Sequence, residues 1–198
     1  MEAIRGKRCF ELDVSEFTNR IAAYEQTWID LGTGDGRFTR WMAARQPERF
    51  FVGIDACREN LRAASRKEIP NLLFVIASAQ SLPPLGGVAA GIYINFPWGS
   101  LLAGLLDEPE PLVNGLAALC GPRAQLHLHL NAEALAEFDR GLESGADQIQ
   151  NVLEHSGWSL EVRACMDAPA LRAFPSTWAK RLAFGRDPRA IHLRLRRA

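Results

Sequence analysis

The sequence predicts an α/β fold on a mainly parallel sheet, and three observations support this prediction. Apolar runs with the period of strands alternate with runs of helical period along the whole chain. A glycine-rich turn, LGTGDGR (31–37), follows directly on the apolar run TWIDLG. Two acidic residues, Asp30 and Asp55, end successive predicted strands, where open α/β sheets place their ligand-binding residues.

Each element has a local reason. CFELD (9–13) predicts a short strand, and Ser15 is expected to cap the helix EFTNRIAAY that follows. Continuous apolar runs indicate strands buried on both faces, whereas AQLHLHL, LEVRACM and IHLRLRR alternate like half-buried strands. We therefore expect strands at 27–32, 50–55, 72–78, 91–95, 124–130, 160–166 and 191–197, and helices at 37–46, 57–68, 132–155 and after FPWG.

The composition is that of an ordinary soluble globular protein, with 198 residues of which 47% are apolar and 23% charged. Its length fits a single domain, with residues 1–26 as an N-terminal extension of a core over 27–198. No apolar run approaches the ~20 residues of a membrane span and no signal peptide is visible, so we expect a cytoplasmic protein, which we take to be monomeric. The four cysteines form no C-x-x-C pair, which indicates reduced thiols, and no metal site is predicted.

Charge is distributed unevenly along the chain, although the formal net charge is zero. Residues 72–171 contain 3 basic and 11 acidic side chains, a net charge of −8. Residues 172–198 contain 8 basic side chains and one acid, Asp187, a net charge of +7. Such asymmetry can mark a surface that binds an anionic polymer, and a solvated C-terminal strand is the alternative.

The glycine turn matches neither of two common phosphate-binding motifs. A P-loop needs Lys and then Ser or Thr after its last glycine, whereas Arg37 and Phe38 follow here. A dinucleotide fingerprint needs Gly or Ala at its last position, and both possible frames place another residue there. What fits is the pattern Asp30-x-Gly32-x-Gly34-x-Gly36 of an S-adenosylmethionine site, in which the acid can accept from an α-ammonium group.

Two further positions fit the same ligand. Asp55 lies 19 residues past Gly36 and is placed to accept both ribose hydroxyls. Ala79 and Gln80, after the third core strand, can line an adenine ring. The sequence therefore predicts a class I methyltransferase, with a tight turn in an unrelated α/β domain as the alternative.

Two tryptophans indicate the methyl acceptor. Trp98 follows a strand end, where doubly wound sheets bind ligands, and we expect it over the transferred methyl group. Trp178 lies in the basic C-terminal segment, where it is either a stacking residue or a packed surface residue. A base within folded nucleic acid must be flipped out and stacked, so the pair indicates an aromatic clamp. Trp28 and Trp41, in contrast, are expected in the core.

Five ordered motifs resemble the kanamycin–apramycin resistance methyltransferases over about 6–185: IDLGTGDGR, GIDACRENL, FVIASAQSLP, NFPWGSLL and STWAKRLAFGR. The resemblance implies a class I (Rossmann-like) S-adenosylmethionine-dependent methyltransferase with a seven-stranded, mainly parallel sheet and an N-terminal β-hairpin within 1–26. It also implies methylation of N1 of adenine 1408 in 16S rRNA of the assembled 30S subunit, with S-adenosylhomocysteine as product and aminoglycoside resistance as consequence.

The resemblance assigns roles to the matching positions. Trp98 and Trp178 would sandwich the flipped adenine. Apart from the resemblance, Asn95 and Pro97 are placed to contact its amino group. The rRNA-binding residues would be Lys180, Arg181, Arg186 and Arg189. The cofactor-binding residues would be Asp30, Gly32, Thr33, Gly34, Gly36, Asp55, Ala56, Ala79, Gln80, Phe96, Ser100 and Ser176.

The expected chemistry needs no general base, because adenine N1 carries an in-plane lone pair at neutral pH and alignment supplies most of the rate. No acid or base partner is visible for the histidines, which are expected to be structural or exposed. They are His127, His129, His155 and His192.

Three departures from the family pattern keep other functions open. Asn95 replaces an apolar residue, so NFPW is similar to the N-P-P-[FYW] loop of methyltransferases acting on exocyclic amines. Asp187-Pro188 interrupts a basic run, and 131–160 is shorter and more acidic than the family's substrate-facing linker. The alternatives are a methyltransferase of an exocyclic base amine or a small molecule, and a weakly active or non-catalytic rRNA-binding homologue.

Overall fold

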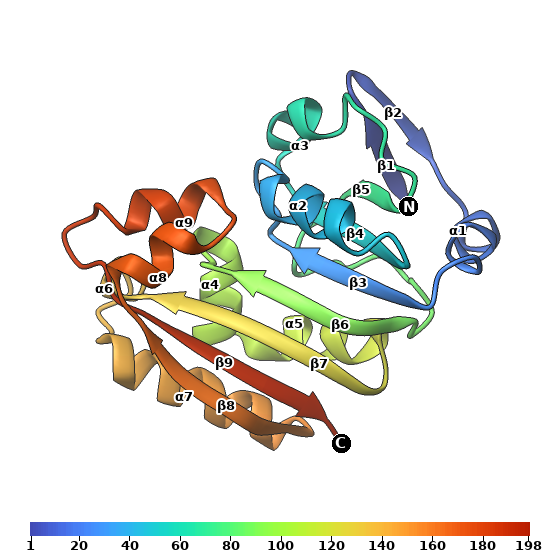
Figure 1. Ribbon diagram of the computed structural model, residues 1–198. Helices are drawn as coiled ribbons and strands as arrows, with labels where there is room; N and C mark the ends of the chain where they lie inside the picture. The colour runs from blue at the N-terminus through green and yellow to red at the C-terminus, as the bar shows by residue number, and fades with distance from the viewer.

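The computed structural model describes residues 1–198 as a nine-stranded sheet with helices on both faces (Figure 1). The strand order is β2-β1-β5-β4-β3-β6-β7-β9-β8. The strands are β1 Glu2–Arg5, β2 Arg8–Glu11, β3 Gln26–Leu31, β4 Arg49–Asp55, β5 Leu72–Ile76, β6 Ala89–Asn95, β7 Cys120–Asn131, β8 Trp158–Met166 and β9 Ala190–Arg197. The helices are α1 Val14–Ile21, α2 Arg37–Arg45, α3 Arg58–Ala64, α4 Gly99–Leu106, α5 Pro109–Leu119, α6 Ala132–Ala136, α7 Leu142–His155, α8 Ala168–Ala173 and α9 Thr177–Leu182.

The middle of the sheet is parallel, which confirms the predicted class. Strands β5, β4, β3, β6 and β7 run in one direction, and β9 inserts antiparallel between β7 and β8. The first core strand, β3, lies beside β6, although β4 and β5 come between them in sequence. The strand order thus reverses at β3 and β6, and doubly wound sheets bind ligands at the carboxyl ends of such a pair.

The sheet has nine strands rather than seven because the N-terminal hairpin joins it. Strands β3 to β9 form the seven-stranded core, and Ala3 of β1 pairs with Val75 of β5 to add β1 and β2 at the edge. The hairpin turn joins Arg5 to Arg8 and begins at Gly6, whose φ of 59° favours glycine. The extension is therefore part of the same hydrogen-bonded sheet.

Apolar packing fixes both faces of this sheet. A core of 36 buried residues lies between the sheet and the helices α1, α4, α5 and α7. A smaller core of 10 buried residues lies under α2 and α3 on the other face. A third cluster, of 6 residues, packs α8 and α9 on Phe96 and Ala190. The carboxyl ends of β3 and β6 therefore pack against the largest core.

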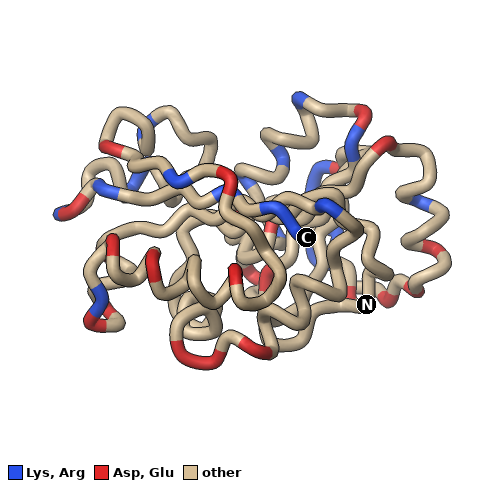
Figure 2. Tube along the Cα trace, turned by 90° about the horizontal axis from the view of Figure 1, so that it is seen from below, with Lys and Arg blue, Asp and Glu red and all other residues tan.

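Charged residues are also distributed unequally between two sides of the molecule. Acidic residues gather on one side of the molecule, whereas most Lys and Arg lie on the other (Figure 2). The acidic side chains of the sequence between β6 and β8 include Asp107, Glu110 and Asp147. An anionic polymer is therefore attracted to the other side, which carries the basic residues.

Three local expectations are wrong. Asp13, not Ser15, caps α1, because the Asp13 carboxylate accepts from the Glu16 N–H at 2.7 Å and the Ser15 hydroxyl donates to that carboxylate. The helix expected over 132–155 is broken into α6 and α7 at a turn in which Asp139 has a φ of 54°.

Trp41 does not lie in the core. Its side chain is 39% exposed on α2, and the Arg45 guanidinium lies 4.5 Å from the ring centroid. Trp28 is buried as expected, against Gly91. None of the helices is long and apolar enough to cross a membrane.

Candidate active site

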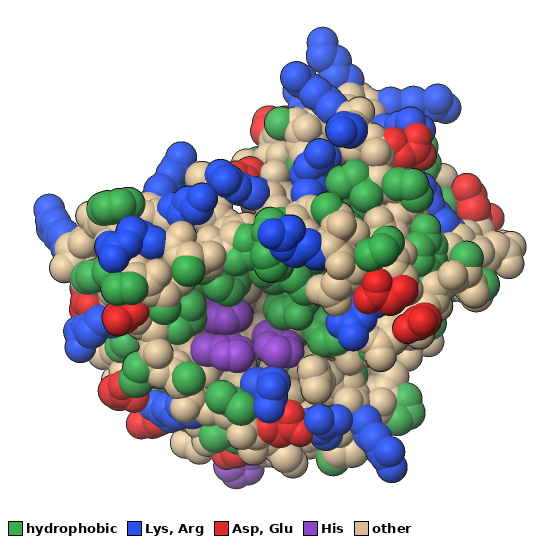
Figure 3. Space-filling model, viewed as in Figure 1, with side chains coloured by type: hydrophobic (Ala, Val, Ile, Leu, Met, Phe, Trp, Pro, Cys, Tyr) green, Lys and Arg blue, Asp and Glu red, His purple; other side chains and the backbone are tan.

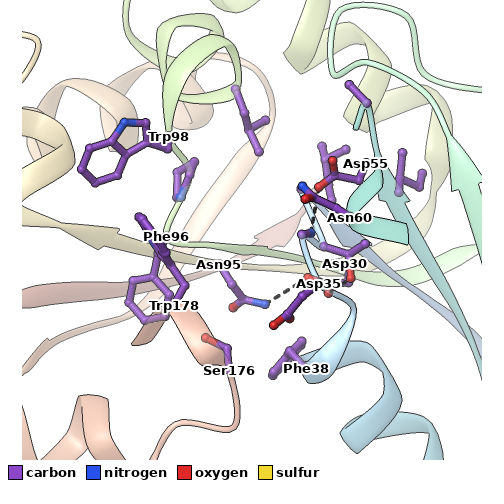
Figure 4. A pocket seen from close by; sticks show the side chains of 18 of the residues that line it. Asp30, Asp35, Phe38, Asp55, Asn60, Asn95, Phe96, Trp98, Ser176 and Trp178 are labelled. Atoms are coloured by element: carbon purple, nitrogen blue, oxygen red, sulfur yellow. Dashed lines mark hydrogen bonds between the residues drawn. The ribbon is translucent and has the colours of Figure 1, made fainter. Parts of the chain in front are cut away.

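A cavity of about 590 Å³ opens at the carboxyl ends of β3, β4 and β6, where the strand order reverses (Figure 4). Its walls come from the glycine turn, the ends of these strands, the start of α4 and the start of α9. Most of the predicted site residues lie together on its walls: Asp30, Gly32, Thr33, Gly34, Asp55, Ala56, Ala79, Asn95, Phe96, Pro97, Trp98, Ser100, Ser176, Trp178 and Arg181.

The glycine turn approaches the cavity with a backbone that only glycine tolerates well. Gly32, Gly34 and Gly36 have φ values of 74°, 56° and 67°. A Cβ on Gly32 would meet the Leu101 side chain at 2.6 Å, so the turn and α4 close on each other without room for a side chain. The backbone itself therefore forms the wall against which a nucleoside can lie.

Asp30 is the buried acid of the site, with 2% exposure. The hydroxyls of Thr33 and Thr39 donate to its Oδ2 at 2.6 and 2.5 Å, and Asn95 Nδ2 donates to its Oδ1 at 3.0 Å. Burial raises the pKa of Asp30 to about 6, against the opposing effect of these three hydrogen bonds. One lone pair of Oδ1 remains free to accept from a cationic group in the cavity.

Asp55 ends β4, on the same side of the cavity as Asp30 (Figure 4). Its Oδ2 accepts from the Gly34 N–H at 2.7 Å and its Oδ1 from the Cys57 N–H at 2.8 Å. These bonds fix the carboxylate across the glycine turn, and each oxygen keeps one lone pair for a ligand hydroxyl. The two acids thus face one cavity from adjacent strands.

The segment after β6 brings Trp98 to the cavity through an unusual backbone turn. Phe96 has a φ of 54°, a left-handed conformation that is rare for a non-glycine residue. Its N–H donates to the His129 carbonyl at 2.8 Å, and its buried ring packs edge-on against Phe174. Strain of this kind at a site that is over-determined by packing is typical of functional segments.

Helix α9 brings the second indole. The Ser176 hydroxyl accepts from the Ala179 N–H at 3.0 Å and so caps the start of the helix. The helix ends at Leu182, before Gly185. Trp178, the second residue of the helix, is 37% exposed, and the Arg181 guanidinium lies 5.8 Å from its ring centroid.

The two indoles meet at the cavity mouth. The ring centroids of Trp98 and Trp178 are 5.5 Å apart and their planes cross at 89° (Figure 4). A base held between parallel rings needs a separation of about 7 Å, twice the ~3.5 Å of a van der Waals contact. In this edge-to-face arrangement the two rings leave no space for a purine between them.

The predicted basic residues differ in their availability. Arg181 lines the cavity and Lys180 is exposed on α9. The turn at Arg186 is anchored to α6, because its N–H donates to the Glu133 carboxylate at 2.6 Å. Arg189 is engaged by both oxygens of Asp187, at 2.7 and 2.6 Å, so the acid that interrupts the basic run neutralises its neighbour.

Comparison with known proteins identifies the family. The family model "NpmA: 16S rRNA (adenine(1408)-N(1))-methyltransferase" matches residues 2–196. The chain belongs to the NpmA family. Two NpmA-family relatives named 16S rRNA (adenine(1408)-N(1))-methyltransferase, from Streptoalloteichus hindustanus and Escherichia coli, are 32% and 35% identical over 94% of both chains.

Solved structures agree with this assignment. The crystal structure of the 16S rRNA methyltransferase KamB has a TM-score of 0.90 and 29% identity, with 100% of both chains covered. A W203A mutant of the 16S rRNA (adenine(1408)-N(1))-methyltransferase from Catenulisporales acidiphilia, with the cosubstrate S-adenosylmethionine, has a TM-score of 0.85 and 27% identity, with 100% of this chain and 97% of that chain covered.

The cavity fits the cosubstrate of that relative. A free acceptor on buried Asp30 suits an ammonium group, and the glycine turn leaves no side chain between the backbone and a nucleoside. No group of three or more His, Cys, Asp or Glu side chains is arranged to hold a metal ion.

Several assignments fall outside the cavity walls, and others were missed. Gly36 caps α2 under Ala64 and Phe74, and Gln80 reaches the Ser100 carbonyl at 3.1 Å, so neither lines the cavity directly. The walls also include residues that were assigned no role, although all of them except Phe38 lie within the five motifs. They are Leu31, Asp35, Phe38, Ile54, Asn60, Ala77, Leu101 and Thr177.

Proposed function

We propose that this chain transfers a methyl group from S-adenosylmethionine to N1 of adenine 1408 in 16S rRNA of the 30S subunit. Methylation at this position would make a bacterial host resistant to aminoglycosides. The observation that supports the proposal most directly is that one cavity joins two halves: the Asp30–Asp55 wall and the Trp98–Trp178 mouth. Membership of the NpmA family supplies the identity of the base.

The cofactor half would hold S-adenosylmethionine, which supplies an electrophilic methyl group on a positively charged sulfonium. Asp30 would accept from the α-ammonium group through the free lone pair of Oδ1. Asp55 would accept from the ribose hydroxyls, and Ala79 and Leu101 would flank the adenine ring. Thr33 and Thr39 contribute by keeping the Asp30 carboxylate immobile.

The acceptor half would hold the flipped adenine between the indoles of Trp98 and Trp178. Such stacking contributes about 1–3 kcal/mol per base, and indole faces also stabilise the cation that forms as the methyl group arrives. Trp178 is the ring that turns, because it is 37% exposed at the cavity mouth whereas Trp98 is half-buried. Alignment of the N1 lone pair with the methyl group would supply the rest of the rate enhancement, and no side chain has to take a proton.

The rRNA would contact the basic side of the molecule near α9. Arg181 stands beside the stacking ring and suits a phosphate next to the flipped base, while Lys180 and Arg186 suit neighbouring phosphates. We propose that the protein acts on 30S subunits in the cytoplasm, as a monomer.

The test is methylation of purified 30S subunits with labelled S-adenosylmethionine, mapped by reverse-transcription stops. We expect a stop at adenine 1408 and mass-spectrometric detection of 1-methyladenosine. Subunits that carry guanine at this position are the matched control, because guanine N1 bears a proton and no free lone pair. Cofactor binding without any stop at 1408 would remove the substrate assignment and leave a methyltransferase fold with another acceptor.

A further inference from the structure

Asn95, at the end of β6, connects the cofactor half of the site to the interior of the sheet. Its Nδ2 donates to Asp30 Oδ1 at 3.0 Å (Figure 4). Its Oδ1 lies 2.9 Å from His129 Nδ1. The side chain thus bridges two buried residues on the neighbouring strands β3 and β7. Both ends of its amide are occupied before any ligand arrives.

The chemistry of the partners fixes the direction of this chain of hydrogen bonds. An ionised carboxylate only accepts, so the amide nitrogen of Asn95 must face Asp30. The amide oxygen then faces His129, whose Nδ1 must carry the proton. His129 is therefore held as the neutral Nδ1–H tautomer. Burial, together with the neighbouring His192 and His127, lowers its pKa well below the usual range, in agreement with a neutral ring.

His129 is itself immobilised. Its ring stacks on His192 of the paired strand β9, with centroids 4.4 Å apart and planes at 11°, and meets the Phe174 ring edge-on at 4.8 Å. His127 continues the stack on His192. Figure 3 shows histidine side chains gathered in a hollow of this face. The His129 carbonyl also accepts from the Phe96 N–H, so one residue braces both Asn95 and the segment that leads to Trp98.

We propose that Asn95 is a positioning residue: held from behind by His129, it fixes the Asp30 carboxylate so that the free lone pair of Oδ1 faces the cofactor's α-ammonium group. The inference rests on the proposed binding of S-adenosylmethionine and is independent of which base is methylated. It also assigns the Asn95 amide to Asp30 and not to the amino group of the target base.

The arrangement also sets the pH range of cofactor binding. The hydrogen bond from Asn95 lowers the pKa of Asp30, against burial and the charge of Asp55, which raise it. Loss of the bond raises that pKa and removes the charged acceptor at a higher pH. Other titratable groups around Asp30 are Tyr93 on β6, His129 behind Asn95, and Asp35 and Arg181 on the cavity wall.

The experiment measures S-adenosylhomocysteine binding by calorimetry, without RNA, between pH 5 and 8.5. The variants are Asn95→Leu, which removes both bonds, and His129→Phe, which keeps the ring stack but removes the donor. Methylthioadenosine serves as a second probe because it lacks the amino-acid moiety. Asn114→Leu, an exposed position on α5, is the matched control.

For Asn95→Leu we expect about tenfold weaker S-adenosylhomocysteine binding and a pH midpoint about one unit higher. His129→Phe should shift both in the same direction by less, and methylthioadenosine binding should not change in either variant. Equal losses for both probes, or an unchanged pH midpoint, would overturn the inference. Unchanged binding with loss of methyl transfer would overturn it too, by assigning Asn95 to the base. Failure of the unmodified chain to bind S-adenosylhomocysteine would contradict the proposed function itself.

Discussion

The two halves of the cavity are built in different ways. In the cofactor half, both acids are held by hydrogen bonds: Asp30 by two threonines and Asn95, and Asp55 by two backbone N–H groups. In the acceptor half, Trp98 and Trp178 touch only edge-to-face, and Arg181 lies exposed beside them. The proposed cofactor half is organised without a ligand, whereas the proposed acceptor half would have to open to admit a base.

The two ligands would therefore gain their affinity in different ways. A small cofactor gains affinity from a site that is already organised, because few side chains lose freedom on binding. A base in folded rRNA arrives with many phosphate contacts, and these can drive the turn of one indole.

Asp30→Asn should nearly abolish cofactor binding in the preorganised half. The substitution keeps the shape of the side chain, and the hydroxyls of Thr33 and Thr39 can turn to accept from the new amide. It removes the charge that would pair with the ammonium group, at an expected cost of about 4 kcal/mol, or roughly 1,000-fold in affinity. Calorimetry with S-adenosylhomocysteine measures the loss, and affinity within tenfold of the original would contradict the assigned role.

The same substitution should stabilise the ligand-free fold at neutral pH. Burial raises the pKa of Asp30 from 3.8 to about 6, so its protonated form favours the folded state. That contribution is complete below about pH 4 and is lost as the pH rises through about 6, for a total of about 3 kcal/mol. Asp30→Asn does not titrate and keeps the neutral form at every pH.

Urea denaturation at pH 4 and pH 7.5 measures this effect. The stability of Asp30→Asn relative to the original chain should rise by about 2.5 kcal/mol between the two pH values, because part of the contribution is already lost at pH 4. Taking the difference cancels the histidines, whose pKa values are lowered by burial and whose neutral forms therefore favour folding above pH 6.5 in both proteins. A pH-independent difference would mean that Asp30 ionises normally and that the cofactor half stores no electrostatic cost.

Trp178→Ala should impair only the half that opens. We expect kcat/KM for methylation of 30S subunits to fall roughly 30-fold, which corresponds to a loss of about 2 kcal/mol of stacking energy. Cofactor affinity should not change. Trp41→Ala is the matched control, because Trp41 is equally exposed at 39% but lies outside the cavity. Parallel losses in both variants would show that indole removal acts through stability and not through stacking.

The sequence predicted the preorganised half better than the half that opens. Asp30, the glycines and Asp55 obey local rules, since a strand end and a tight turn determine where their atoms lie. Trp98 and Trp178 were predicted to share a site, but their edge-to-face contact depends on how α9 packs on Phe96 through Phe174. Nothing local encodes that packing.

The histidine stack is a second feature that the sequence predicts only in part. His127 and His129 are two apart on one strand, and that spacing places them on one face. That His192 lies opposite His129 follows only from the antiparallel insertion of β9, a long-range choice of strand partner. Likewise, Arg189 reads as a free cation in sequence, although Asp187 two residues earlier is its bidentate partner.

That last pair gives the smallest expected effect. Asp187→Asn should release Arg189 to contact phosphate and tighten 30S binding about threefold, because exposed ion pairs of this kind are weak. The slope of log affinity against log salt should steepen by about 1, as for one added phosphate contact.

Asp147→Asn is the matched control, because it also removes an acid that is paired with an exposed arginine, Arg163, but on the α7–β8 side. It makes the same change in net charge. If both variants tighten binding equally, the gain comes from net charge alone, and the basic segment contributes no specific contact at Arg189. A gain confined to Asp187→Asn would instead place rRNA phosphate against the turn between α9 and β9, directly beside the mouth that opens.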